Sequence, residues 1–299
     1  MNFSPTGNAA ARLGIVLMLL GALLFTLNDT VGKWLVSTYS VGQLLLIRSG
    51  AAILVLAPFL WRGGLTPLFK VERPGMQALR VLLASGEVYA FYFAVIYLPL
   101  ADAMTYWLAA PIYVAALSPF LLGEKVGWRR WTAIFLGFCG VLIALEPSSA
   151  TLTPAAIISI LGSLAFTFML ISSRILRGTP DVTLVFWQMI GAAVVGLATA
   201  PFGWVTPDLR DFLLLALLGV VAMGAHVCIN RALKLADAAT VVPFQYTQLF
   251  WAILFGWLVF SDVPRLNMMI GATIIVASGL FIFFREHQLK RGNADIVDP

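Results

Sequence analysis

Long apolar runs recur along the entire chain, each close to the length that a lipid bilayer demands of a helix. A membrane-spanning α-helix needs about 20 mostly apolar residues, because each residue advances about 1.5 Å across a hydrocarbon core of about 30 Å. Short connections separate the runs and leave no room for a soluble domain between them. We therefore predict an all-α polytopic membrane protein. Its ten transmembrane helices are expected at 13–35, 41–61, 76–98, 102–122, 128–146, 153–174, 182–203, 211–232, 238–260 and 266–284.

Composition excludes a single water-soluble globule. Of the 299 residues, 61% are hydrophobic and only 11% are charged, whereas a soluble domain has about 25% charged residues. The first residues are polar and lack a basic cluster, so we expect no cleaved signal peptide. Cys139 and Cys228 both fall within predicted helices, which supports neither a disulfide framework nor a zinc site.

Basic residues gather at alternate ends of the predicted helices. With a cytoplasmic N-terminus, most of the 19 lysines and arginines lie at or near the inner face. Lys33, Arg210 and Arg265 lie near the outer face, and Arg48 lies within a helix. This distribution follows the positive-inside rule and predicts that both termini are cytoplasmic. Topology then explains the net charge of +5, and we expect no nucleic-acid partner.

The two halves of the chain repeat each other. LGALLFTLNDTVGKWL at 20–35 matches LGSLAFTFMLISSRIL at 161–176, and PLADAMTYW at 99–107 matches KLADAATVV at 234–242. Five predicted helices separate the first pair of matches, and because five is odd, the second copy enters the membrane from the opposite side. We predict two five-helix inverted-topology repeats, 1–147 and 148–299, around a central cavity.

The fourth and ninth predicted helices contain prolines within their apolar runs. Pro111 lies in the middle of the fourth helix, Pro119 two turns later, and Pro243 early in the ninth. Proline removes a backbone hydrogen bond and bends a helix. These helices hold the same position in the two repeats, so related kinks are expected to flank the centre. Kinks that serve packing alone are the alternative.

The passages ADAMTYWLAAP at 101–111 and FLLGEKVGWRRW at 120–131, with the ten helices in two halves, resemble the EamA branch of the drug/metabolite transporter superfamily. In that family the fourth helix of a half ends in a Gly-Glu-basic turn, which Gly123-Glu124-Lys125 matches. The second half departs from it with Phe260-Ser261-Asp262. The resemblance implies a bacterial inner-membrane exporter of small metabolites. The aromatic content is most like that of the subgroup that exports aromatic amino acids.

Ionisable residues inside a bilayer are costly, and each one is a functional candidate. Asp29 can pair with Lys33, four residues later on the same helix face near the outer side. By depth, Asp29 and Arg48 can also neutralise each other between the first two helices; an outer gate or an anchor for a substrate carboxylate is the alternative. Glu87 and His226 fall at similar depths on the third and eighth helices, which are repeat mates. We predict that both line the cavity, where Glu87 binds a substrate amino group or carries a proton. An interhelical hydrogen bond is the alternative for His226.

Aromatic and amide side chains complete the predicted binding site. A cavity for an aromatic or amphipathic solute needs apolar walls with a few fixed polar groups, and an aromatic face also attracts a cation. Ordinary helix packing, and helix–helix hydrogen bonds for the amides, are the alternatives. The residues selected as further substrate contacts are Trp107, Trp187, Tyr106, Phe244, Asn28 and Gln245.

Motifs of energy coupling and hydrolysis are absent from the sequence. There is no phosphate loop, no H-E-x-x-H and no G-x-S-x-G, so we expect neither an enzyme nor a metal or cofactor. The prediction is a secondary transporter that exports small organic metabolites, most of all amino acids including aromatic ones, by alternating access. Alternatives are an exporter of nucleosides, sugars or toxic organic cations, or a passive channel. The expected partners are a small-molecule substrate and membrane lipids, with no obligate protein partner. Proton coupling, resting conformation and oligomeric state stay open.

Overall fold

Helices make up all the regular structure in the part of the chain that the computed structural model describes, residues 7–63, 66–69, 71, 73–121, 123, 127–145, 153–176, 178–235 and 241–297. The turn residues Glu124 and Lys125 and the Ala-Asp-Ala match at 236–238 lie outside these ranges. The elements are α1 (Gly7–Leu35), α2 (Val41–Gly63), α3 (Thr66–Phe69), α4 (Pro74–Tyr97), α5 (Leu100–Leu108), α6 (Ala110–Leu121), α7 (Trp128–Leu145), α8 (Pro154–Ile175), α9 (Asp181–Thr199), α10 (Leu209–Leu235), η1 (Val242–Tyr246), α12 (Thr247–Phe260) and α13 (Leu266–Val297).

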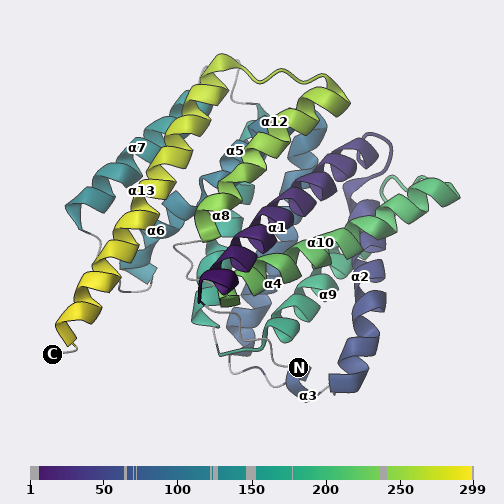
Figure 1. Ribbon diagram of the computed structural model, residues 1–299. Coiled ribbons are helices and arrows are strands. Elements are labelled where there is room, and N and C mark those ends of the chain that lie inside the picture. The colour runs from purple at the N-terminus through teal and green to yellow at the C-terminus, as the bar shows by residue number, and fades with distance from the viewer. Residues whose placement is uncertain are drawn as a thin grey trace.

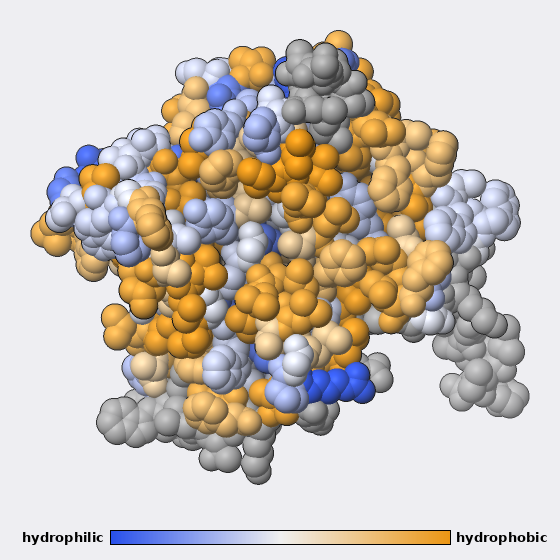
Figure 2. Space-filling model, turned by 180° about the vertical axis from the view of Figure 1, so that it is seen from behind, coloured by the Kyte–Doolittle hydropathy of each residue, from blue (hydrophilic) through white to orange (hydrophobic). Residues whose placement is uncertain are grey.

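Every predicted apolar run coincides with one of these helices or with a pair of them. In the described residues, seven helical segments are long and apolar enough to cross a membrane. Three shorter apolar segments, in α7, η1–α12 and α13, fall on the remaining runs. The chain is therefore a multi-pass membrane protein. Large apolar side chains such as Leu54, Phe120 and Phe135 are exposed, and Figure 2 shows that apolar residues cover most of one face of the molecule.

The fourth and ninth predicted helices are both interrupted. The fourth consists of α5 and α6, which meet at Ala109, two residues before Pro111. Proline lacks the N–H that would bond to the carbonyl four residues back, and its ring clashes with that carbonyl, so the regular helix stops there. The ninth begins with the 3-10 helix η1, which contains Pro243, and continues as α12. Pro111 and Pro243 thus mark interruptions in the two halves, as predicted, whereas Pro119 lies inside the continuous helix α6.

The helices of the two halves pack against each other in equivalent ways. Helix α1 packs against α10 and α12, and its repeat mate α8 packs against α4, α5 and α6. Two pairs join equivalent helices to each other: α2 with α9, and α7 with α13, which lie side by side in Figure 1. The largest contacts between the halves therefore have counterparts in which the roles of the halves are exchanged.

Side-chain contacts fix the relative directions of the helices. Near the end of α1, Lys33 Nζ donates to the carbonyl of Leu98, which follows α4, at 3.1 Å. Near the end of α8, by contrast, Ser173 Oγ accepts from Arg80 Nε, in the first turns of α4, at 2.8 Å. Helix α1 therefore runs parallel to α4, and α8 runs antiparallel to it. The helices that carry the matching sequence are thus antiparallel, as an inverted repeat requires.

Two ion pairs join the halves at one end of the molecule, which we call the Lys33 end. Lys33 Nζ lies 2.7 Å from Asp262 Oδ2, and Arg265 lies 3.2 Å from Asp102 Oδ2. At the same end, Tyr39 lies between α1 and α2 and donates its hydroxyl to Asp211 at 2.6 Å. This hydrogen bond to a carboxylate raises the pKa of Tyr39 to about 12, because ionisation of the phenol would break it.

Candidate functional site

Tyr92 is the centre of a buried polar cluster that joins three helices. Its side chain on α4 is 1% exposed, and its hydroxyl accepts hydrogen bonds from Asn28 Nδ2 of α1 at 3.0 Å and from Arg48 of α2 at 2.9 Å. The guanidinium also lies 5.4 Å from the centre of the Tyr92 ring. Gly32 gives the ring its space, because a methyl group there would lie 2.8 Å from the Tyr92 hydroxyl.

Asp29 belongs to the same cluster but not as the ion-pair partner of Arg48. Its Oδ1 accepts from Asn28 Nδ2 at 3.1 Å, and the described residues contain no ion pair between Asp29 and Arg48. The side chains interact electrostatically at longer range, because Tyr92 takes the guanidinium hydrogen bond. The two charges are thus near each other, as predicted, but they are linked through Asn28 and Tyr92.

Glu87 lies on α4 and binds an indole. Trp107 Nε1 on α5 donates to Glu87 Oε2 at 2.9 Å, and the Glu87 side chain is 8% exposed. The Trp107 ring meets Phe91 edge to face with 5.0 Å between ring centres. Its far end packs on Gly162 of α8, where a methyl group would lie 2.7 Å from the indole. Glu87 and Asp29 are close enough to interact electrostatically, so both acids belong to one cluster.

His226 lies on α10 beside the cluster, and its contact is aromatic. Its ring meets Phe25 of α1 edge to face at 4.8 Å between ring centres. The two side chains predicted to share a depth, Glu87 and His226, form neither a hydrogen bond nor an ion pair with each other in the described structure. The charged groups that act on His226 are Arg48 and Arg80. It therefore neighbours the basic side of the site.

Four other selected residues lie away from this cluster. Tyr106 is buried with Ile112 in a second core, against which Trp107 also packs. Trp187 donates its indole N–H to the carbonyl of Leu68 in α3 at 2.8 Å. Phe244 and Gln245 are half-buried in η1, which packs against α1.

Sequence reasoning did not select Tyr92 or Arg80 as site residues. Arg80, assigned to the inner face, is 6% exposed and donates to Ser173 Oγ, to the Leu184 carbonyl and to Gln188 Oε1. Tyr92 stands in the aromatic stretch EVYAFYF. Every turn of that stretch presents an aromatic ring, so its sequence gives no signal of which ring faces the polar residues of α1 and α2.

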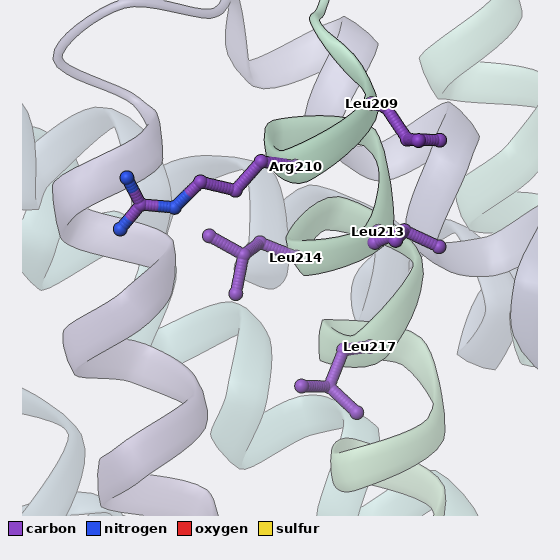
Figure 3. Close-up of a pocket in the computed structure, with 5 residues that line it drawn as sticks. All are labelled: Leu209, Arg210, Leu213, Leu214 and Leu217. Atoms are coloured by element: carbon purple, nitrogen blue, oxygen red, sulfur yellow. The ribbon is translucent and has the colours of Figure 1, made fainter.

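A groove on the surface of α10 is separate from the polar cluster. It has a volume of about 510 Å³, and Figure 3 shows its lining of leucines beside one arginine, Arg210, on successive turns of the helix. Leu209 and Leu213 are exposed, and Arg210 lies 5.9 Å from the centre of the Trp34 ring. None of the polar cluster lines this groove, so its chemistry is that of an apolar surface with one arginine at its edge.

Comparison with known proteins also divides the chain into two halves. The model of the EamA-like transporter family matches this chain twice, at residues 12–145 and 153–284. An S-adenosylmethionine uptake transporter of Rickettsia prowazekii (strain Madrid E) is 26% identical, over 91% of this chain and 93% of its own length. Riboflavin transporters of Rhizobium johnstonii and Vibrio cholerae are 30% and 29% identical, over 94% and 95% of this chain and 94% and 97% of their own lengths. A solved crystal structure matches with a TM-score of 0.59 at 18% identity, over 92% of this chain and 97% of that chain, which shows the fold alone.

Proposed function

Because the chain belongs to the EamA-like transporter family, we propose that it is a secondary transporter that takes up a small organic metabolite through a site built around Asn28, Arg48, Glu87, Tyr92 and Trp107. The family and the named relatives are membrane transporters of small molecules and not enzymes. The observation that carries the proposal is the Tyr92 cluster, because polar groups held within membrane-spanning helices mark substrate or ion pathways.

The architecture proposed for transport has ten membrane-spanning helices, α5–α6 and η1–α12 each counting as one. The halves 1–147 and 148–299 are inverted repeats, with both termini in the cytoplasm of a bacterial inner membrane. The antiparallel α1 and α8 and the interchangeable pairing of the halves support this arrangement. Two such halves can exchange conformations, so that a site near the midplane opens first to one side and then to the other.

Names of the relatives favour uptake of a heteroaromatic metabolite over export of an amino acid. S-adenosylmethionine and riboflavin each carry a planar nitrogen-containing ring system, and both names describe transporters of such compounds. Phe91 and Trp107 provide aromatic surfaces beside the polar cluster. Rings of this kind bind planar solutes by stacking and edge contacts. The sequence predicted aromatic amino acid export, which none of these names reports, and phenylalanine therefore serves as the competing substrate in the test.

Uptake into proteoliposomes tests the proposal. Labelled riboflavin, S-adenosylmethionine and phenylalanine are each offered to the reconstituted protein, with and without a pH gradient. We expect saturable uptake of at least one heteroaromatic compound and loss of that uptake in Glu87→Gln. Asp208→Asn is the matched control, because Asp208 is exposed and asparagine caps a helix as well as aspartate does. Uptake that does not saturate indicates a channel, and the absence of uptake for all three compounds refutes the proposal.

A further inference from the structure

The balance of charged side chains in the Tyr92 cluster indicates the chemistry of the substrate. The described ionisable side chains there are Asp29, Glu87 and Arg48, with His226 beside them. Lys33, one turn from Asp29, is paired with Asp262. Arg48 is thus the one described cation that directly contacts the cluster, and its hydrogen bond goes to a neutral phenol.

Arg80, the other basic group near His226, is already occupied. It donates to three neutral acceptors: a hydroxyl, a backbone carbonyl and an amide oxygen. Neither Asp29 nor Glu87 forms an ion pair within the described residues. Two carboxylates thus lie near a single guanidinium, and that guanidinium forms an ion pair with neither of them.

Within the described residues, three acceptors of the cluster lack a hydrogen-bond partner, beside the N–H groups of Arg48 that do not bond to Tyr92. Asn28 is 3% exposed, and its Oδ1 is buried without a hydrogen-bond partner. Asp29 is bonded through Oδ1 and Glu87 through Oε2, and the described structure gives neither second carboxylate oxygen a hydrogen bond. An unpaired buried acceptor is destabilising, and more so when it is charged. A ligand that satisfies these groups brings donors or positive charge.

Trp107 is a second group that attracts positive charge. The indole is held by its N–H bond to Glu87, by Phe91 and by Gly162. Trp107 is half-buried, so part of the ring surface is open. Tryptophan is the aromatic residue whose face attracts cations most strongly. Carboxylate and indole together form a site for an organic cation.

We propose that the substrate of this transporter is an organic cation, with an ammonium or sulfonium group held between Asp29 and Glu87 and against Trp107. The proposal rests on the proposed function and adds the charge of the substrate to it. A neutral heteroaromatic compound could donate hydrogen bonds to these acceptors, but it would bring no positive charge to Asp29 and Glu87. A proton taken up by one carboxylate would satisfy the charge but would give no preference for a cationic solute.

Binding to the purified full-length protein tests the charge with two matched pairs of probes. S-adenosylmethionine and S-adenosylhomocysteine differ by one methyl group and the sulfonium charge, and 2-phenylethylammonium and 2-phenylethanol differ by the ammonium charge. Dissociation constants come from ligand-dependent thermal stabilisation. In at least one pair, we expect the dissociation constant of the cation to be lower than that of its neutral partner by about ten-fold or more.

Variants then locate the preference in the cluster. Glu87→Gln keeps an oxygen that accepts from Trp107 and loses only the charge, so it should abolish the preference for the cation. Asp29→Asn serves the same purpose if Glu87→Gln does not fold, and Asp208→Asn should keep the preference. Equal or tighter binding of both neutral probes, no binding of any cation, or a preference that survives both cluster variants overturns the proposal.

The outcomes separate this inference from the proposed function. Saturable uptake of neutral riboflavin without any preference for cations leaves the transporter proposal standing and refutes the cation site. Absence of saturable uptake refutes the transporter proposal, whatever the binding data show.

Discussion

Gly219 allows α10 to approach the helix that carries Arg48, and its replacement should disturb both stability and binding. The residue is buried. A methyl group at this position would lie 2.8 Å from the carbonyl carbon of Arg48, closer still to its oxygen, and 3.3 Å from the backbone nitrogen of Ala52. These are backbone atoms of α2 and cannot rotate away, so Gly219→Ala must move one helix relative to the other.

The expected magnitude follows from two opposing effects. Overpacking of this kind costs about 1–3 kcal/mol of stability, while alanine is favoured over glycine in a helix by about 1 kcal/mol. Gly219→Ala should therefore lose about 1 kcal/mol of unfolding free energy. Gly224→Ala is the matched control on the same helix, because nothing lies within 4 Å of a methyl group there. It should gain up to about 1 kcal/mol.

Unfolding of both variants in detergent micelles measures this difference, expected to be about 2 kcal/mol between them. A displaced α2 also carries Arg48 away from the Tyr92 hydroxyl, which it contacts at 2.9 Å. Substrate affinity should therefore fall in Gly219→Ala and stay unchanged in Gly224→Ala. Equal unfolding free energies for the two variants would show that the helices do not approach at Gly219, and the reasoning would fail.

Three further experiments test contacts in the Tyr92 cluster and at the Lys33 end. Tyr92→Phe removes the acceptor shared by two helices and should cost about 1–3 kcal/mol of unfolding free energy, measured by denaturation; no loss would contradict the hydroxyl's central position. Trp107→Phe keeps an aromatic ring but leaves Glu87 without its N–H donor, so substrate affinity should fall about ten-fold, whereas Trp128→Phe, at an exposed ring, should leave it unchanged. Reversing the partly buried pair as Lys33→Asp with Asp262→Lys should restore most of the stability that either single change removes, and a double variant no better than the singles would show that the pair contributes nothing.

The apolar runs determine the helices because bilayer thickness sets their length, and the order and placement of the helices could be predicted from them. Their ends could not, since α1 begins at Gly7 and α13 extends to Val297, beyond the predicted ranges. Prolines predicted the interruptions in α5–α6 and η1–α12, since a missing N–H has the same consequence in any surroundings. The side-chain partners could not be predicted in the same way. A membrane helix is apolar on its lipid face and on its packed face alike, so periodicity does not reveal which side turns inward.

The candidate site shows this limit in particular residues. Arg48 and Asp29 were recognised because charges are rare within membrane helices, and both lie in the Tyr92 cluster. Trp107 and Trp187 were both selected as aromatic residues inside predicted helices, yet only Trp107 contacts Glu87, and Trp187 bonds to Leu68. The direction of each ring depends on helix rotation, which is fixed by long-range packing such as the contact of Trp107 with Gly162.

The repeat that gives the fold its symmetry does not extend to the polar cluster. In the aligned segments 20–35 and 161–176, Met169 and Leu170 stand where the first half has Asn28 and Asp29. Met169 is buried as an apolar core residue. The two halves thus share a backbone plan while the polar groups of α1, α2, α4 and α5 all come from the first half. Within the proposed transport cycle, the substrate's polar contacts therefore belong to one half, and the second half contributes chiefly packing surface and the motion that changes access to the site.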